Sequence, residues 1–190
     1  MTAATPLTLY TIGHSNHPPE RFLTLLLQHQ IKTLVDVRSV PYSHYMPHFR
    51  RAALEDLLPA IGVRYVYLGR ELGGRPSGAH LLDAAGHPRY DRMADQPSFQ
   101  HALDTVLALA AEASTAIMCS EEDPLQCHRR NLIGQALRDR PVTLLHIRKY
   151  GGAEPETWEA EGQLPLLDDN GRPRTVRRKP RRQPPLLPRS

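Results

Sequence analysis

Residues 115–130, with the sequence TAIMCSEEDPLQCHRR, join a buried apolar strand to the beginning of a helical pattern. The stretch contains both cysteines of the chain, three consecutive acidic residues, a histidine and two arginines. In an open α/β sheet, ligands bind and chemistry takes place at this kind of junction. The stretch therefore indicates both the fold class and the place where function is expected.

Strand patterns alternate with helix patterns on both sides of this stretch. Strands are expected at residues 7–12, 33–37, 63–68, 115–118 and 142–147, and helices at 18–29, 48–61, 98–111 with Ser98 as N-cap, and 123–138 with Asp123 as N-cap. The strands are continuously apolar, which is typical of strands buried on both faces. The pattern predicts a three-layer α/β fold with a mostly parallel sheet of about five strands and helices on both faces.

Composition divides the chain of 190 residues into a domain and an extension. We expect one α/β domain at 1–155, interrupted by a Gly- and Pro-rich insertion at 69–97, and an extension at 156–190. Residues 171–190 hold seven Arg, one Lys and no acid, so they carry a charge of +8 and the rest of the chain −4. This segment predicts a disordered basic tail, either an arm for nucleic acid or a solvated extension.

Several protein classes are disfavoured by the sequence. No run of 18 or more apolar residues occurs, so no transmembrane helix and no membrane partner are expected. Residues 1–6 lack the basic and apolar regions of a signal peptide, which favours a cytoplasmic protein. Two cysteines do not make a disulfide framework, and free thiols or metal ligands are the expected states.

Polar and ionisable side chains follow four of the predicted strands. They are His14 and Ser15 after the first strand, Asp36 and Arg38 at the second, Gly73, Gly74 and Arg75 after the third, and Cys119 and Glu121 at the fourth. Because the carboxyl ends of parallel strands meet at one edge of a sheet, these groups are expected to converge there. Convergent polar groups are typical of an enzyme or a small-ligand site.

Four motifs occur in the order typical of the DUF488 family: YTIGHS at 10–15, VDVR at 35–38, ELGGR at 71–75 and MCSE followed by CHR at 118–129. The chain resembles this family over about residues 8–150, and differs from its pattern at 43–49 and in an insertion whose aromatic content is reduced. The resemblance implies a fold and a set of candidate residues, not an activity. The candidates are Gly13, His14, Ser15, Asp36, Arg38, Ser43, Phe49, Leu72, Gly73, Gly74, Arg75, Cys119, Glu121, Cys127, His128 and Arg129.

Cys127 falls in the first turn of a predicted helix, where exposed N–H groups favour a thiolate. It is a candidate nucleophile or metal ligand, with a buried packing role as the alternative. Adjacent helical residues diverge by about 100°, so His14 is a better expected partner of Cys127 than His128. Glu121 is a candidate general acid or base, and Asp36 either orients Arg38, acts as a base or forms a salt bridge with Arg38.

A substrate-binding set and a metal alternative complete the predicted site. The substrate-binding set is Ser15, Arg38, Ser43, Gly73, Gly74, Arg75, His128 and Arg129, in which the arginines hold an anion. The Gly-Gly-Arg segment is otherwise an ordinary turn. Neither cysteine begins a phosphatase Cys-x5-Arg loop, because Leu125 and Ile133 stand where the arginine is required. Cys119, Cys127 and His128 are acceptable zinc ligands, although their spacing matches no common zinc module.

The leading hypothesis is a small enzyme, a hydrolase or transferase, that acts without a cofactor on a small phosphate-bearing or nucleotide-like anion at the carboxyl edge of the sheet. Cys127, Glu121, Asp36 and His14 would be its catalytic residues. A non-catalytic module that binds nucleic acid through residues 171–190 is the first alternative. A thiol or metal-binding protein that holds zinc is the second.

Overall fold

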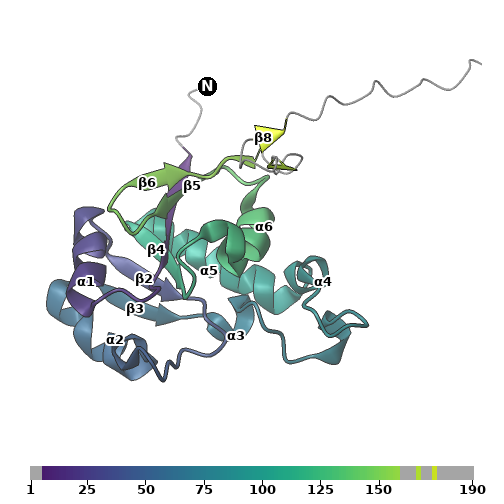
Figure 1. The fold of residues 1–190 in the computed structure, drawn as a ribbon, viewed down its shortest axis with the longest axis horizontal. Coiled ribbons are helices and arrows are strands. Elements are labelled where there is room, and N and C mark those ends of the chain that lie inside the picture. Colours follow the sequence, from purple (N-terminus) through teal and green to yellow (C-terminus); the bar gives the residue numbers. More distant parts are fainter. Residues whose placement is uncertain (1–5, 159–165, 168–172, 175–190) are drawn as a thin grey trace, which may run out of the picture. The chain divides into compact units, whose positions relative to one another are not determined.

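The computed structural model describes residues 6–158, 166–167 and 173–174. Its main sheet has six strands in the order β3-β2-β4-β1-β5-β6 (Figure 1). The strands are β1 (Leu7–Gly13), β2 (Thr33–Asp36), β3 (Arg64–Tyr67), β4 (Thr115–Cys119), β5 (Val142–Ile147) and β6 (Ala153–Pro155). The first five are mutually parallel and only β6 runs antiparallel, against β5. The predicted mostly parallel α/β sheet is confirmed, with one more strand than expected.

Helices cover both faces of this sheet (Figure 1). They are α1 (Pro19–Gln28), α2 (Arg51–Leu57), α3 (Gly69–Leu72), α4 (Tyr90–Ala94), α5 (Pro97–Glu112) and α6 (Gln135–Leu137). On one face, α1 and α2 bury Phe22, Leu25, Leu26 and Leu54 against Ile12, Leu34, Ala116 and Met118 of the sheet. On the other face, α5 packs along β1, β2 and β4. The burial of both faces explains why the strands read as continuous apolar runs.

Prolines move two helix boundaries from their predicted positions. The helix expected to start at Ser98 starts at Pro97, which suits the first position because that position needs no N–H, and Gln96 is its N-cap without a side-chain cap. The helix expected over 48–61 is divided into a 3-10 turn at Pro47–Phe49, helix α2, and a 3-10 turn at Pro59–Ile61. Pro59 lacks the N–H that would continue α2.

The insertion at 69–97 contains regular structure. Helix α3 follows β3 directly, a 3-10 turn spans Ala79–Leu81, and α4 precedes α5. Both α3 and α4 pack against α5. The segment thus belongs to the same layer as α5 and delivers residues to the carboxyl edge of the sheet.

The largest local departure from prediction lies after β4. Asp123 caps the N–H of Leu125 at 3.0 Å, as expected, but the helix that it begins is one 3-10 turn, Pro124–Gln126. Cys127 then has an extended backbone, with φ −130° and ψ 143°. Helical hydrogen bonds resume at the Cys127 carbonyl, and a π-helix spans Arg129–Gly134 before α6. Cys127 therefore lies between two helical segments, and the prediction that it sits in the first turn of a helix is wrong.

The chain divides into two compact units, residues 1–156 and 157–190. In the second unit, β7 (Leu166–Leu167) pairs antiparallel with β8 (Pro173–Arg174). Apart from residues 173–174, the predicted tail at 171–190 lies outside the described residues. Across the part of the chain that the structure describes, no helix is both long and apolar enough to span a bilayer.

Candidate functional site

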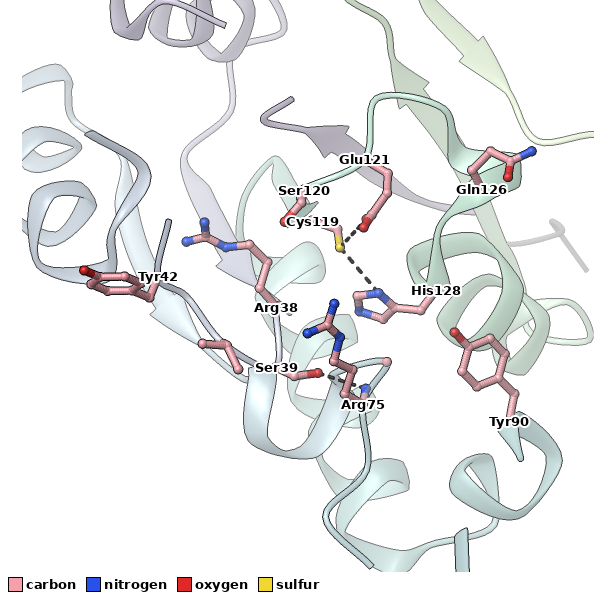
Figure 2. Close-up of a pocket in the computed structure, with 12 residues that line it drawn as sticks. Arg38, Ser39, Tyr42, Arg75, Tyr90, Cys119, Ser120, Glu121, Gln126 and His128 are labelled. Atoms are coloured by element: carbon pink, nitrogen blue, oxygen red, sulfur yellow. Dashed lines mark hydrogen bonds between the residues drawn. The ribbon is translucent and has the colours of Figure 1, made fainter. Parts of the chain in front are cut away.

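A cavity of about 380 Å³ opens at the carboxyl edge of the sheet, where β2 and β4 end (Figure 2). We call it the edge cavity. Its lining residues are Arg38, Ser39, Val40, Tyr42, Gly74, Arg75, Tyr90, Cys119, Ser120, Glu121, Gln126 and His128. They come from the segments after β2, α3 and β4 and from helix α4. The structure therefore brings three of the four predicted strand-end segments into one concave surface.

Four potential ligand or catalytic groups meet on one wall of the edge cavity, and we call them the thiol cluster: Cys119, Glu121, Cys127 and His128. The thiols of Cys119 and Cys127 donate to Glu121 Oε2 at 2.9 Å and 3.1 Å. The Nδ1 atom of His128 lies 3.4 Å from the Cys119 sulfur and 4.0 Å from the Cys127 sulfur. All four donor atoms lie within 4.8 Å of one another.

His128 belongs to this cluster because Cys127 is not helical. The expected divergence of the two side chains is wrong, since it assumed a continuous helix. The Nε2 atom of His128 lies 3.0 Å from the carbonyl oxygen of Val37, so Nε2–H donates there and Nδ1 faces the two sulfurs. The ring packs against Gly74, where a Cβ atom would stand 2.8 Å from His128 Cβ. Because Gly74 has no Cβ atom, the His128 side chain can pack directly against its backbone.

The thiol cluster changes the protonation of its own members. A hydrogen bond with Cys119, aided by His128 and Arg129, lowers the pKa of Cys127 to about 6. The same pairing with Cys127, together with burial, raises the pKa of Cys119. Burial would raise the pKa of Glu121, but the bonds from the two thiols outweigh it and lower that pKa. The cluster therefore favours a carboxylate at Glu121, and Cys127 is the thiol that ionises first, at which point it no longer donates to Glu121.

Arg38 enters the edge cavity from a buried polar network. Its guanidinium donates to Asp36 Oδ2 at 2.6 Å and to the Phe49 carbonyl at 2.8 Å. The Tyr65 hydroxyl donates to the same Asp36 oxygen at 2.7 Å. Asp36 is fully buried, and its oxygens are occupied by these donors. The salt-bridge alternative for Asp36 and Arg38 is confirmed, and Asp36 orients the guanidinium.

His14 lies beside Arg38, whereas the expectation placed it beside Cys127. Its Nε2 atom lies 3.1 Å from Arg38 Nη1, and its Nδ1 atom lies 2.9 Å from the Ser15 carbonyl oxygen. Burial, with a contribution from Arg38, lowers the pKa of His14 to about 4. The neutral ring therefore donates to Ser15 and accepts from Arg38. The imidazole that contacts Cys127 is His128.

Arg129 was expected to bind an anion, and the structure places it in the interior with no exposed surface. Its guanidinium donates to the carbonyls of Glu121 and Glu122, and its Nε–H donates to Thr11 Oγ1 at 3.2 Å. Arg129 therefore holds the backbone of the loop that carries Glu121. Gly13 serves the same loop, because a Cβ atom there would lie 1.8 Å from the Glu121 carbonyl oxygen.

The Gly-Gly-Arg segment is divided by the structure. Gly74 and Arg75 line the edge cavity, and the Arg75 backbone N–H donates to Ser39 Oγ at 2.9 Å. Figure 2 shows the Arg75 guanidinium directed into the cavity. Gly73 lies outside the lining and packs against Ser39, where a Cβ atom would stand 2.3 Å from Oγ. Of the three residues, Gly74 and Arg75 therefore reach the cavity.

Ser15 and Ser43 do not line the edge cavity. Ser15 takes a left-handed backbone, with φ 46°, and its N–H donates to the Ser120 carbonyl at 2.8 Å. The Ser43 hydroxyl accepts the N–H of Met46 at 2.9 Å and closes a turn. Both residues shape the loops beside the site.

Sequence reasoning missed part of the lining, namely Ser39, Val40, Tyr42, Tyr90, Ser120 and Gln126. Ser39 and Ser120 could have been found, because each directly follows a predicted site residue. Tyr42 is 60% exposed and has the Arg50 guanidinium 4.4 Å from its ring centre. Tyr90 comes from the insertion, and no local pattern indicated that α4 reaches the sheet edge.

Fold and site together define an α/β protein with a polar cavity at the carboxyl edge of a mostly parallel sheet. The family model described as "Domain of unknown function DUF488" matches residues 18–136, and the chain belongs to this family. The match begins after Gly13, His14 and Ser15, so it is shorter than the resemblance expected over 8–150. Comparison with curated proteins and with solved structures gave no match.

Proposed function

We propose that this protein is a hydrolase or transferase that acts on a small phosphate-bearing, nucleotide-like substrate in the edge cavity. One observation carries the proposal: the cavity unites the thiol cluster with two arginines. Cys119, Glu121 and His128 line it together with Arg38 and Arg75. Reactive groups and cations that share one concave surface can hold an anion while another part of it reacts.

Arg75 is the main anion-binding group of this proposal. Its side chain is exposed, and among the described residues no acceptor takes a hydrogen bond from its guanidinium. Arg38 lines the same cavity, and its Nη1 carries a second N–H besides the one directed at His14. Guanidinium groups bind phosphate oxygens through charge-assisted, often paired hydrogen bonds. The two arginines thus favour phosphate over a neutral ligand.

Two tyrosines favour a substrate with a planar group. Tyr42 and Tyr90 both line the edge cavity, and Tyr42 is largely exposed. Aromatic rings bind nucleobases by stacking. The volume of about 380 Å³ lies within the range of small-molecule sites. A mononucleotide meets these requirements, with its phosphate at Arg75 and its base at a tyrosine.

Glu121 is the proposed proton acceptor. The lowered pKa of Glu121 keeps its carboxylate ionised at neutral pH, and the side chain reaches the cavity. General base catalysis needs an ionised group in contact with the reacting proton. His128 completes the reaction centre, the buried Cys127 sulfur acts through its hydrogen bond with Glu121, and His14 and Asp36 act by positioning Arg38.

Calorimetric titration with adenosine monophosphate and with inorganic phosphate tests the anion site. We expect Arg75→Ala to weaken both ligands by about tenfold, since a hydrogen bond to a charged group is worth about 1.5 kcal/mol or more. The matched control is Arg70→Ala, because Arg70 is exposed on α3 and lies outside the edge cavity. Equal affinity of wild type and Arg75→Ala for both ligands would overturn the proposal.

A turnover assay tests the proposed role of Glu121 as the general base. A panel of nucleotides is incubated with wild type and with Glu121→Gln, and product formation is followed by chromatography. Loss of the general base should slow the reaction by about 100-fold or more. A product that forms equally fast with both proteins would exclude Glu121 as the base.

A further inference from the structure

We propose that Cys119, Glu121, Cys127 and His128 bind one zinc-type metal ion on the wall of the edge cavity. The inference deepens the proposed function, because it uses the same cluster and adds a resident cation to the substrate site. It stands on three features: the donor set, the spacing of the donors, and the hydrogen bonds that aim them.

The donor set is two thiols, one imidazole and one carboxylate. Thiolate and imidazole together select zinc and related first-row ions over magnesium or calcium, which require oxygen ligands. Structural zinc sites commonly use cysteine and histidine alone, whereas catalytic sites include a ligand that exchanges with water or substrate. The carboxylate of Glu121 is the member that fits such an exchangeable position.

The spacing of the donors fits a single ion. A tetrahedral zinc site with Zn–S of about 2.3 Å and Zn–N or Zn–O of about 2.0 Å places sulfur about 3.5 Å from nitrogen or oxygen. The observed sulfur-to-oxygen distances to Glu121 are 2.9 Å and 3.1 Å. The sulfur-to-nitrogen distances to His128 are 3.4 Å and 4.0 Å. The Cys119–His128 distance of 3.4 Å is close to the tetrahedral value, and the other three differ from it by roughly half an ångström, which side-chain rotation can supply.

Outer hydrogen bonds aim these donors. The His128 Nε2–H donates to the Val37 carbonyl at 3.0 Å, an arrangement that metal-bound histidines commonly have because it fixes the ring and leaves the other nitrogen free. The Arg129 backbone N–H points at the Cys127 sulfur at 3.4 Å, which favours a sulfur that carries negative charge. Val37 belongs to the segment after β2, so the outer partner comes from a different strand than the ligands.

Hydrogen bonds on the side away from the cluster hold the loop that carries the ligands. Arg129 binds the carbonyls of Glu121 and Glu122, and Asp123 caps the turn before Cys127. A preformed loop lowers the conformational entropy lost when the metal binds. The ligands are therefore fixed by contacts that do not need the ion.

The site is closed on one side and open on the other. Cys127 is 2% exposed and lies outside the cavity lining, whereas Cys119, Glu121 and His128 line the cavity. An ion bound to all four would be reached from the cavity past Glu121. A substrate phosphate at Arg75 could then approach the same ion (Figure 2).

The test uses the full-length chain, kept reduced, stripped with a chelator and titrated with Zn²⁺ against a chromogenic competitor. One Zn²⁺ per chain is expected, and Co²⁺ should give the thiolate charge-transfer bands of a tetrahedral site. Cys119→Ser and Cys127→Ser should each weaken Zn²⁺ binding by more than about 100-fold, since even outer partners of metal ligands are worth about 10–100-fold. Glu121→Gln should weaken it by about tenfold.

The matched control is Glu122→Gln, the neighbouring acid, whose carboxylate pairs with Arg148 outside the cluster. This variant should bind Zn²⁺ like wild type. Failure of reduced wild type to bind Zn²⁺ or Co²⁺ overturns the inference, and so does wild-type affinity in both cysteine variants. A Cys119–Cys127 disulfide that forms in place of metal binding would also overturn it. Arg75-dependent phosphate binding by the metal-free chain separates the two proposals, because it would survive the loss of the metal site.

Discussion

Among the residues that the structure describes, two clusters combine a histidine with a glutamate and a potential nucleophile, and the two differ in how far solvent reaches the nucleophile. Three members of the thiol cluster, Cys119, Glu121 and His128, line the edge cavity. The second, which we call the sealed network, consists of Thr11, His146, Glu156 and Arg130. The Thr11 hydroxyl lies 2.7 Å from His146 Nδ1, and His146 Nε2 lies 3.0 Å from Glu156 Oε2. Arg130 Nε donates to the same oxygen at 2.9 Å.

The order hydroxyl, imidazole, carboxylate in the sealed network is the order of a hydrolase triad. Thr11, however, has no exposed surface, and His146 is 4% exposed. No substrate can reach this hydroxyl. Access, not residue type, separates a candidate reaction centre from a structural network.

Arg129 connects the two clusters. Its Nε–H donates to Thr11 of the sealed network, and its Nη1 donates to the carbonyl of Glu121 in the thiol cluster. The sealed network therefore contributes to the position of the open one. Substitutions in the sealed network should mainly reduce the stability of the fold, whereas substitutions in the thiol cluster should mainly reduce ligand binding.

The largest effect on stability is expected for Glu156→Gln. Glu156 is about as buried as the Arg130 and His146 side chains that it bonds. Removing one carboxylate from a buried charged network costs about 3–5 kcal/mol. Urea unfolding of Glu156→Gln and of Glu121→Gln compares the two clusters. Glu121→Gln should lower the free energy of unfolding by less than about 1 kcal/mol, because Glu121 is exposed. Equal losses in the two variants would remove the distinction between sealed and open clusters.

The sequence predicted the sheet because its signal is local and repeated. Five apolar strands alternate with helices, and the structure places all five in one parallel array. Strand β6, Ala153–Pro155, was missed because three residues that end in proline show no apolar pattern. It forms only because β5 is there to pair with it.

The candidate site was predicted less completely, for reasons that depend on tertiary contacts. Strand-end position was enough to find Glu121, Arg38 and Arg75. The meeting of Cys127 with His128 requires a break between helical segments that capping rules do not reveal, since Asp123 and Pro124 look the same before a 3-10 turn and before an α-helix. The burial of Arg129 depends on two carbonyls and on Thr11 from distant strand β1, so charge alone suggested the wrong role.

Acid should destabilise the fold by the next largest amount. Burial, with Arg38, holds the pKa of His14 at about 4, below its usual 6.5, so the unfolded chain binds a proton at a pH where the folded chain does not. The stability from neutral His14 is complete above pH 6.5 and is lost as the pH falls toward 4, by about 3 kcal/mol. Burial also lowers the pKa of His146, so the sealed network acts in the same direction.

Urea unfolding of wild type and of His14→Asn at intervals from pH 7 to pH 4 measures this loss. The variant has no group to titrate at this position, so its stability should fall less steeply than that of wild type across the same window. Parallel curves for the two proteins would show that the charge state of His14 does not limit stability in acid.

The smallest of these effects, and the most selective, is expected for Gly13→Ala. The new Cβ atom would lie 1.8 Å from the Glu121 carbonyl oxygen, so the loop that Arg129 holds must move. Forcing a methyl group into such a contact costs about 1–3 kcal/mol in urea unfolding and should also weaken Zn²⁺ binding at the thiol cluster. Gly86→Ala is the control, since Gly86 has φ +83° and open space around it. It should lose about 1 kcal/mol through backbone strain alone and keep its Zn²⁺ affinity. Wild-type Zn²⁺ affinity in Gly13→Ala would mean that the close approach of β1 does not position Glu121.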